Sequence, residues 1–424
     1  MAKTQENKEV LTSQPERAFP IACIGASAGG LDAIKKLLEN LQLDTGLAFV
    51  VIQHLATNQE SMLPEILARF TQMPVNKIEG GMKIEPNLVY VIPAGKIITI
   101  QNGHIKLQPK GVYLKPIDVF LCSLAIERKT HAIGIILSGT GNDGTEGLKA
   151  IKAEGGITFA QEPKTAQYSD MPKSAMNAEA VDFVLPPERI AEEISSIAKH
   201  PEITRQKIES EESKPQEVEN NQQAIFTMLR AAFGVNFANY KKTTINRRIS
   251  RRMILNNIET LSRYVEFLRK HPEEQQALFD NMLINVTDFF REPNTFLCLK
   301  EVFPELAGRK QHSQTIRVWI PGCSTGEEVY SMAIALTEFI EEKKLDLQIL
   351  IFGTDVNAKN IEKARRGIYL KTMSNTVSED RLKRFFVSSN GNYQVIKTIR
   401  DNVFSQNMTL CKTPLFQHGL NCLS

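Results

Sequence analysis

Three residues with the side chains of acyl-transfer chemistry, Ser27, His54 and Asp143, each follow a short apolar run. Ser27 is the centre of GASAG (25–29), which fits the G-x-S-x-G pattern of a strand, a sharp turn and a helix. His54 ends the segment FVVIQH, and Asp143 lies in the glycine-rich segment SGTGNDG (138–144). The carboxyl ends of parallel strands meet at one edge of a sheet, so we expect the three side chains to lie together.

The chemistry predicts a role for each of these residues. Ser27 would be the nucleophile, and His54 the general base that takes its proton. Asp143 would hold the imidazole in the required tautomer. The oxyanion would be bound by the backbone N–H of Ala28, directly after the nucleophile, and by that of Thr140 or the following glycine.

Each residue taken alone has a simpler explanation. The glycines around Ser27 could equally form a loop that cradles a phosphate, and this stretch by itself does not decide between the two. A histidine after a strand is often a structural residue, and an aspartate between glycines is often a turn residue or a helix cap. The chain order Ser, His, Asp differs from the order Ser, Asp/Glu, His of the α/β-hydrolase fold, which disfavours an ordinary esterase or lipase.

Composition and charge exclude several classes of protein. The chain has 424 residues, 42% of them hydrophobic and 23% charged, which predicts two or three ordinary globular domains. The net charge of +3 is too small for a general nucleic-acid or membrane-surface role. The six cysteines form no C-x-x-C pair, so neither a zinc site nor a disulfide framework is predicted, and no metal site is expected. No signal peptide and no membrane-spanning run is found, which predicts a cytoplasmic protein.

The elements that must position these residues follow from the pattern of apolar runs. Residues 19–199 alternate short apolar runs with helical patterns, which predicts an α/β domain with a largely parallel sheet. Its strands are expected at 21–24, 48–53, 88–92, 131–137, 157–160 and 183–185, and its helices at 31–41, 60–70, 117–127, 145–154 and 190–199.

The rest of the chain is predicted as four further segments. Residues 1–18 are polar and charged and are expected to be a disordered leader. Residues 200–223 are charged and contain two prolines, which predicts a linker. Residues 224–306 show helical patterns without strands. Residues 307–424 are predicted to be a second, incomplete α/β domain, with strands at 316–320, 347–353 and 402–405.

A dense group of basic residues lies in NYKKTTINRRISRRM (239–253). Arg247 and Arg251, like Arg248 and Arg252, are four residues apart and would share one face of a helix. Such runs are usually solvated helix faces, but this one is dense for a nearly neutral chain. Nucleic acid is disfavoured because no aromatic stacking platform is interleaved with the arginines. We therefore expect these arginines to dock on an acidic protein surface.

A second strand–loop–helix pattern lies in VWIPGCSTGEEVYS (318–331). Its glycine loop, 322–326, is followed by Glu328, and such a loop lets a nucleotide-like ligand approach the backbone. Asp355 ends the next predicted strand, where a carboxylate can bind ribose hydroxyls. Together they predict a site for a nucleoside cofactor. The simpler alternative is that Asp355 caps the helix beginning near Ala358, and the two roles can coexist.

Four segments of the first domain resemble the catalytic domain of the chemotaxis receptor methylesterases of the CheB type. They are IGASAGGLDAI (24–34), FVVIQHL (49–55), IILSGTGNDGTEGL (135–148) and SDMPKSAM (169–176). The resemblance implies hydrolysis of γ-glutamyl methyl esters, and often deamidation of glutamines, on the cytoplasmic rods of methyl-accepting chemoreceptors or a similar acidic protein. The family's triad falls on Ser27, His54 and Asp143. Its methionine beside the oxyanion falls on Thr140, which leaves only a backbone donor there.

The chain departs from this family at its start. Many members carry an N-terminal receiver domain whose phosphorylation relieves inhibition. Only 18 residues precede the predicted catalytic domain here, so we expect that switch to be absent from this chain. Esterase and deamidase preference stay open, since both reactions pass through the same acyl-enzyme.

Residues 224 to about 414 resemble the chemotaxis receptor methyltransferases of the CheR type, which transfer a methyl group from S-adenosylmethionine to receptor glutamates. The resemblance implies a small all-helical domain, with its docking helix at Arg247–Arg252, and a Rossmann-like cofactor domain. The family's cofactor contacts fall on Asn285, Thr287, Arg291, Glu328 and Asp355.

The second resemblance stops near Phe416. The family continues there with an aspartate-led strand and a Cys-Arg-Asn segment, whereas this sequence ends in QHGLNCLS (417–424). We therefore expect a truncated or frameshifted methyltransferase part, with about three sheet strands, an uncovered edge strand and no methyl transfer.

The sequence thus predicts a protein-glutamate methylesterase fused to an incomplete, partial Rossmann-like methyltransferase. One alternative is a non-catalytic chemoreceptor-binding adaptor, which the presence of all three triad residues disfavours. The other is a working S-adenosylmethionine-dependent glutamate O-methyltransferase, if the missing C-terminal part is supplied. The expected partner is a chemoreceptor or a similar acidic protein, without nucleic acid and without membrane insertion.

Overall fold

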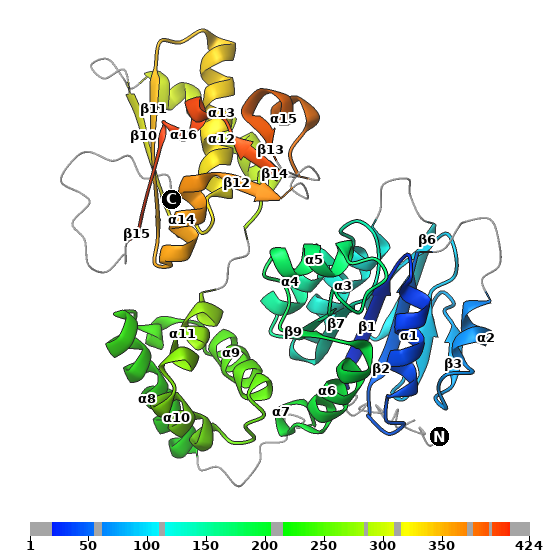
Figure 1. The fold of residues 1–424 in the computed structure, drawn as a ribbon. Coiled ribbons are helices and arrows are strands. Elements are labelled where there is room, and N and C mark those ends of the chain that lie inside the picture. Colours follow the sequence, from blue (N-terminus) through cyan, green and yellow to red (C-terminus); the bar gives the residue numbers. More distant parts are fainter. Residues whose placement is uncertain are drawn as a thin grey trace, which may run out of the picture. The chain divides into compact units, whose positions relative to one another are not determined.

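The computed structural model of the chain describes residues 19–54, 62–109, 115–204, 215–283, 287–308, 315–370, 376–389 and 392–407. The chain forms two compact units (Figure 1). Unit 1 comprises residues 1–226 and 238–271, and unit 2 comprises residues 227–237 and 272–424. The predicted leader at 1–18, the centre of the predicted linker at 205–214 and the chain end at 408–424, with its predicted truncation near Phe416, lie outside the described residues.

The core of unit 1 is a sheet of seven strands in the order β3-β4-β2-β1-β7-β8-β9. Every neighbouring pair is parallel, which confirms the predicted sheet type. All residues of β1 and β7 are buried, because helices cover both faces of the sheet, and this explains their continuous apolar runs. The strands are β1 (Ile21–Ala26), β2 (Ala48–Gln53), β3 (Val75–Lys77), β4 (Val89–Val91), β7 (Ala132–Ile136), β8 (Ile157–Gln161) and β9 (Phe183–Leu185).

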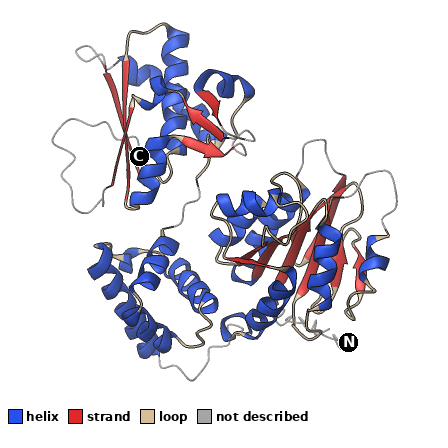
Figure 2. Cartoon of the chain, viewed as in Figure 1, coloured by secondary structure: helices blue, strands red, loops and turns tan. Residues whose placement is uncertain are grey.

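Helices on both faces give unit 1 three layers (Figure 1, Figure 2). Alternate residues of β1 point to opposite faces, so Ala22 and Ile24 join one apolar cluster and Ile21 and Cys23 join the other. The first cluster is completed by α1 (Gly30–Glu39), α2 (Leu63–Leu67) and α6 (Pro187–Lys199). The second is completed by α3 (Pro116–Arg128), α4 (Thr145–Ala153) and α5 (Asp170–Asn177).

Three features of unit 1 are absent from the sequence-based prediction. β3 is a three-residue edge strand, too short for a periodic pattern. β5 (Lys96–Gln101) and β6 (His104–Pro109) form an antiparallel hairpin. Its turn residues Asn102 and Gly103 have φ of 50° and 74°, and an Asn-Gly pair is a known signal for such a turn. Helix α5 coincides with SDMPKSAM, a segment used only for its family resemblance.

Helices also occupy both described ends of the predicted linker at 200–223, so that prediction needs correction there. α7 begins at Pro201 and α8 at Pro215. His200 is buried, with Nε2 3.1 Å from the carbonyl oxygen of Ile258. Linkers and helices with a broad solvated face share a charged composition, so composition alone does not separate them. The helices after the sheet are α7 (Pro201–Thr204), α8 (Pro215–Phe233), α9 (Lys242–Leu255), α10 (Leu261–Lys270) and α11 (Pro272–Met282).

Unit 2 contains a parallel sheet in the order β10-β11-β15 and a small antiparallel sheet in the order β12-β14-β13. The parallel strands lie where the sequence predicts them, as β10 (Thr315–Pro321), β11 (Gln348–Asp355) and β15 (Val403–Asn407). The antiparallel strands β12 (Ile368–Leu370), β13 (Phe386–Ser389) and β14 (Asn392–Val395) are not predicted, because such short strands carry little pattern. After α11, the helices of unit 2 are α12 (Pro293–Gly308), α13 (Glu327–Lys343), α14 (Ala358–Arg366), α15 (Glu379–Phe385) and α16 (Lys397–Arg400).

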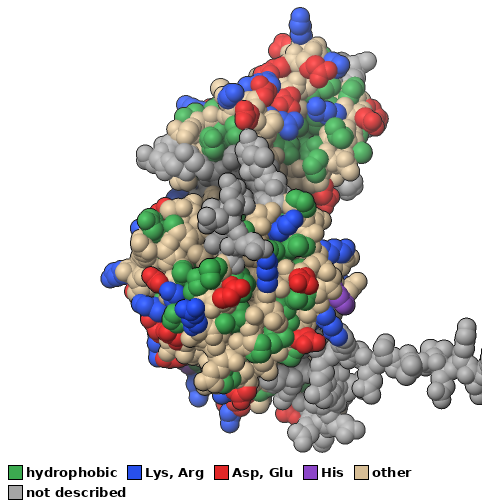
Figure 3. Space-filling model, turned by 90° about the vertical axis from the view of Figure 1, so that its right-hand side faces the viewer, with side chains coloured by type: hydrophobic (Ala, Val, Ile, Leu, Met, Phe, Trp, Pro, Cys, Tyr) green, Lys and Arg blue, Asp and Glu red, His purple; other side chains and the backbone are tan. Residues whose placement is uncertain are grey.

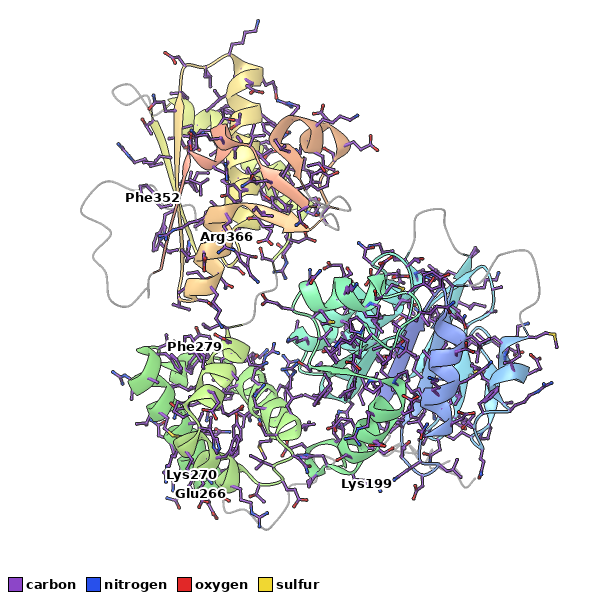
Figure 4. All side chains as sticks on the ribbon, viewed as in Figure 1. Lys199, Glu266, Lys270, Phe279, Phe352 and Arg366 are labelled. Carbon is purple, nitrogen blue, oxygen red and sulfur yellow. The ribbon has the colours of Figure 1, made fainter. Side chains whose placement is uncertain are left out.

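Ile349 and Ile351 of β11 join the apolar cluster that includes residues of α12 and α13, whereas Phe352, labelled in Figure 4, is partly buried and lies outside this cluster. On the face of the molecule in Figure 3, acidic and basic side chains are interspersed. Among the described residues, no helix combines the length and the apolar character that crossing a membrane requires.

Candidate functional site

The strand ends that carry the predicted site residues are neighbours in the sheet. β1 lies between β2 and β7, and Ala26 at the end of β1 stands beside Gln53 at the end of β2. Ser27 follows β1 and His54 follows β2, while Asp143 lies in the loop between β7 and α4. The sheet therefore presents all three at its carboxyl edge, where ligand sites form in open parallel sheets.

Hydrogen bonds join the three side chains. Ser27 Oγ lies 3.2 Å from His54 Nδ1, and His54 Nε2 lies 2.8 Å from Asp143 Oδ2. With its proton on Nε2, His54 donates to Asp143, and Nδ1 accepts from the Ser27 hydroxyl. The imidazole therefore faces the serine with Nδ1, whereas in chymotrypsin-like proteases Nε2 faces the serine. The connectivity is that of a nucleophile, a base and an orienting carboxylate, with Asp143 buried and His54 partly exposed.

The first turn of α3 fixes the Asp143 carboxylate. The backbone N–H of Ile117 donates to Asp143 Oδ2 at 3.2 Å, and that of Asp118 donates to Oδ1 at 2.9 Å. First-turn N–H groups have no acceptor within their helix, and the helix dipole there favours an anion. With His54, three N–H groups hold the carboxylate. The sequence prediction does not include the two backbone donors, although Pro116 at the first helical position is a local signal for the helix start.

Two loops approach each other closely at Ser27. Its N–H donates to Ser138 O at 3.0 Å, and the Ser138 hydroxyl donates to Ala28 O at 2.9 Å. A Cβ on Gly139 would lie 2.9 Å from Ser27 Cβ and would overlap Met171 Sδ. Because glycine lacks that atom, the loop after β7 packs directly against the turn that carries Ser27.

The backbone N–H groups of Ala28 and Thr140, the predicted oxyanion donors, have no acceptor among the described residues. They belong to the two loops that meet at Gly139. Ala28 is partly buried and Thr140 is exposed. Such unused donors suit a developing negative charge, and their role in binding one stays a prediction.

Two thiols close to the site are not reactive at neutral pH. Burial, followed by the charge of Asp143, raises the pKa of Cys23. Burial, followed by the charge of Asp118, raises the pKa of Cys122 to about 11. Both thiols therefore stay protonated, and they act as small apolar side chains in the core.

The structure contradicts the docking prediction for two of the four arginines on α9. Arg248 and Arg251 are only 3% and 1% exposed. Arg248 donates to carbonyls at the end of α4, including Lys152 O at 2.8 Å. Arg251 donates to Gly156 O at 3.0 Å and pairs with Asp182. Guanidinium groups buried within unit 1 cannot form an exposed docking surface, so the prediction is wrong for these two residues.

The other two arginines are partly exposed. Arg247 pairs with Glu154 of unit 1, at the end of α4. A docking role for Arg247 and Arg252 stays a prediction.

In unit 2, the Asp355 side chain forms hydrogen bonds to two segments at the end of the sheet. It accepts the N–H of Ser324 at 2.9 Å and that of Asn357 at 2.8 Å. The first bond holds the glycine loop between β10 and α13. A Cβ on Gly322 would have no atom within 4 Å, so the backbone there faces open space. Glu328 is exposed in the first turn of α13.

The alternative role for Asp355 as a helix cap is corrected by the structure. The cap of α14 is Asn357, whose side chain accepts the N–H of Lys359 at 3.0 Å. Of the remaining predicted cofactor residues, Thr287 is partly buried and Arg291 is exposed. Asn285 lies outside the described residues.

Three family models match this chain in succession. Residues 22–194 match CheB methylesterase. Residues 221–283 match the all-alpha domain of CheR methyltransferase, and residues 285–419 match its SAM-binding domain. The order and extent of these matches agree with the two predicted resemblances.

Individual relatives cover different parts of the chain. The uncharacterized 104.1 kDa protein in the hypE 3′ region of Rhodobacter capsulatus is 33% identical over 84% of this chain, which spans only 39% of that protein's length. A putative protein-glutamate methylesterase/protein-glutamine glutaminase of Leptospira interrogans is 34% identical over 40% of this chain and 90% of its own length. The crystal structure of the Thermotoga maritima CheB methylesterase catalytic domain is 29% identical and aligns over 43% of this chain and 100% of that one, with a TM-score of 0.40. Since the Leptospira protein is matched over nearly its whole length, the chain belongs to the CheB methylesterase family, fused here to the two domains of a CheR methyltransferase.

Proposed function

We propose that unit 1 hydrolyses γ-glutamyl methyl esters of proteins, with Ser27 as nucleophile, His54 as general base and Asp143 as the orienting carboxylate. The hydrogen-bonded series from Ser27 Oγ through the imidazole to Asp143 is the observation that carries this proposal. The name of the Leptospira relative, a putative protein-glutamate methylesterase/protein-glutamine glutaminase, supports the substrate class.

The first half-reaction forms an acyl-enzyme. Ser27 Oγ bonds to the ester carbonyl carbon while its proton moves to His54 Nδ1. The carbonyl oxygen becomes an oxyanion, for which the N–H groups of Ala28 and Thr140 are the proposed donors. Collapse of the tetrahedral intermediate breaks the bond to the methoxy oxygen, which takes the proton from His54 and leaves as methanol. Asp143 stabilises the imidazolium during this transfer.

The second half-reaction restores the enzyme. His54 takes a proton from water, and the resulting hydroxide attacks the carbonyl carbon of the glutamyl–serine ester. The bond to Ser27 Oγ breaks, and the serine oxygen takes the proton back from the imidazolium. A free glutamate side chain remains on the substrate. A glutamine side chain gives the same acyl-enzyme with ammonia as the leaving group, so deamidation is part of the proposal.

We infer that the substrate is a methyl-accepting chemoreceptor or a similar acidic protein. The methylated glutamates of such receptors lie on their cytoplasmic rods, so a cytoplasmic location follows from the proposed substrate. The match of residues 22–194 to the CheB methylesterase model supports this assignment.

Replacement of Ser27 by alanine tests the proposal. Methanol release from a methylated receptor fragment would be measured with the full chain. We expect Ser27→Ala to reduce the rate on the order of a thousandfold or more. Ser195→Ala is the control, because Ser195 is a buried serine of unit 1 that lies in α6 and donates to Ala191 O at 2.8 Å. Release by Ser27→Ala at the wild-type rate would remove Ser27 from the mechanism.

For unit 2, we propose that S-adenosylmethionine binds at the glycine loop 322–326. The open space at Gly322 and the carboxylate of Asp355 beside the loop fit a nucleoside cofactor. Thr287, Arg291 and Glu328 are the further proposed contacts among the described residues. The bound cofactor would supply an electrophilic methyl group for transfer to a carboxylate.

A further inference from the structure

A second carboxylate, Asp118, lies behind the proposed esterase centre and has no role in the mechanism above. It is the third residue of α3 and only 8% exposed. Its backbone N–H donates to Asp143 Oδ1 at 2.9 Å. Its own Oδ1 accepts the N–H of Gly147 at 2.8 Å. One residue therefore contacts both the orienting carboxylate and the helix that follows it.

One of these contacts is made to Asp143 itself, and the other to the start of the helix that follows its loop. Gly147 is the third residue of α4, which begins two residues after Asp143. The start of α3 holds the Asp143 carboxylate through two N–H groups, and the Asp118 side chain holds the start of α4. If either helix shifted, the Asp143 carboxylate would turn relative to the imidazole of His54, to which it is bonded at 2.8 Å.

We propose that Asp118 is a positioning residue of the esterase centre, which locks the first turns of α3 and α4 together around Asp143 and thereby orients His54. The proposal rests on the function proposed for Ser27, His54 and Asp143. Asp118 itself does not touch the reacting atoms.

The strength of the contact between Asp118 and α4 should depend on pH, because the carboxyl group of Asp118 can ionise. Burial, followed by the negative charge of Asp143, raises the pKa of Asp118 to about 7. The Gly147 N–H and the Lys115 ammonium, 3.9 Å from Asp118 Oδ2, act in the opposite direction. The titratable groups that face Asp118 are Lys115 before α3, Cys122 on the next turn of α3, Asp143 in the loop and Glu146 on α4.

A buried carboxylate at this position lowers the stability of the fold, and a purely structural role would not require its charge. An asparagine could accept the same N–H from Gly147 without burying a charge. Ionisable groups that are costly to bury gather at functional sites. When Asp118 is ionised, its bond to Gly147 becomes charge-assisted and the lock is stronger. Esterase activity should therefore follow the ionisation of Asp118 in addition to that of the general base.

Two replacements separate the contact from the charge. We expect Asp118→Ala, which loses the acceptor, to lower kcat on the order of 10- to 100-fold with little change in KM, because Asp118 touches no substrate. Asp118→Asn keeps an acceptor oxygen, so it should recover most of kcat at about pH 6. Its kcat should then rise less steeply than that of the wild type up to about pH 8, because one ionisation is missing.

Asp32→Asn is the matched control. Asp32 is the third residue of α1, as Asp118 is of α3, but its side chain is 80% exposed. We expect the wild-type rate and pH profile from this variant. A wild-type pH profile for Asp118→Asn, together with a wild-type kcat for Asp118→Ala, would overturn the proposal. If Asp118→Ala does not fold, the pH profile of Asp118→Asn decides alone.

Infrared spectroscopy can test the ionisation of Asp118 independently of the esterase activity proposed for Ser27. In the Ser27→Ala background, a carboxylic-acid C=O band should disappear between about pH 6 and pH 8, and it should be missing when Asp118→Asn is added. Wild-type activity of Ser27→Ala would refute the proposed mechanism, yet this band would still report the ionisation of Asp118. A spectrum unchanged by Asp118→Asn would refute the ionisable lock whatever the activity.

Discussion

At the scale of single residues, the proposed esterase centre contains two buried carboxylates that receive different numbers of hydrogen bonds. Asp143 receives three N–H donors, from His54, Ile117 and Asp118. Asp118 receives one backbone N–H, and the ammonium of Lys115 stays 3.9 Å away. Burial is costly for a charge that lacks close partners, so Asp118 is the group whose ionisation should be visible in the stability of the fold.

Asp118→Asn should therefore stabilise the protein at high pH. The pKa of Asp118 rises from 3.8 to about 7 on folding, so the folded state holds this proton more tightly than the unfolded state. The resulting stability is complete below about pH 4 and is lost as the pH rises through 7. We expect the free energy of unfolding of Asp118→Asn, relative to the wild type, to increase by about 2 to 3 kcal/mol between pH 5 and pH 8.

Urea unfolding at the two pH values measures this difference. Asp32→Asn serves again as the control, because its exposed side chain should contribute the same at both pH values. The same pH dependence in Asp118→Asn and in the wild type would show that Asp118 is ionised throughout this range.

Residue types and spacing were sufficient to predict the contact of Ser27, His54 and Asp143. Each follows a recognisable strand, and parallel strand ends share an edge. The N–H groups of Ile117 and Asp118 could not be predicted in the same way. They are 26 and 25 residues from Asp143 in sequence, and only the packing of α3 against the sheet brings them to it.

At the scale of elements, α9 shows why a pattern of charges does not reveal what a helix contacts. Arginines four residues apart share a helix face whether that face meets water or protein. Arg248 meets the carbonyls at the end of α4, where the helix carries partial negative charge. Ile254, near the C-terminal end of α9, joins an apolar cluster of unit 1. The basic helix is therefore a structural part of unit 1.

The buried ion pair of α9 gives a test of this role. Asp182 is buried, and burial raises its pKa, but the charges of Arg251 and Lys152 outweigh that effect and lower it. Arg251→Met would leave Asp182 with the Lys152 ammonium at 3.6 Å as its remaining charged partner among the described residues, beside two hydrogen bonds from Thr158. Since a buried charge without its main partner is strongly destabilising, we expect a loss of about 3 kcal/mol in the free energy of unfolding.

Arg247→Met is the matched control for this prediction. Arg247 lies on the same helix, and its pair with Glu154 is partly exposed, so its loss should cost about 1 kcal/mol or less. Adding Asp182→Asn to Arg251→Met should recover part of the stability, because the unpaired charge is then removed. Chemical denaturation of the wild type, the two single variants and the double variant measures these changes in the free energy of unfolding. Equal losses from Arg251→Met and Arg247→Met would contradict a structural role for the buried pair.

At the scale of the whole molecule, contacts divide the chain differently from composition. The predicted boundaries at residues 199, 223 and 306 follow changes in charge and apolar pattern. The compact units instead group residues 238–271 with the methylesterase domain and residues 272–424 with the SAM-binding part. Sequence patterns locate elements, whereas the grouping of elements depends on pairs such as Arg251 and Asp182, which lie 69 residues apart.

S-adenosylmethionine should stabilise the full chain through Asp355 if unit 2 binds it as proposed. A ligand at 100 times its dissociation constant adds about 2.7 kcal/mol to the unfolding free energy of the part that binds it. Asp355→Asn keeps one acceptor oxygen but loses the charge and one of the two bonds that Asp355 accepts from Ser324 and Asn357. We therefore expect this variant to bind S-adenosylmethionine at least about tenfold more weakly by calorimetry and to lose most of the thermal shift.

Asp346→Asn is the control, because Asp346 is exposed and precedes β11, whereas Asp355 ends it. Equal binding by the two variants would remove Asp355 from the cofactor site, and absence of binding by the wild type would refute the proposal for unit 2 without affecting that for Ser27.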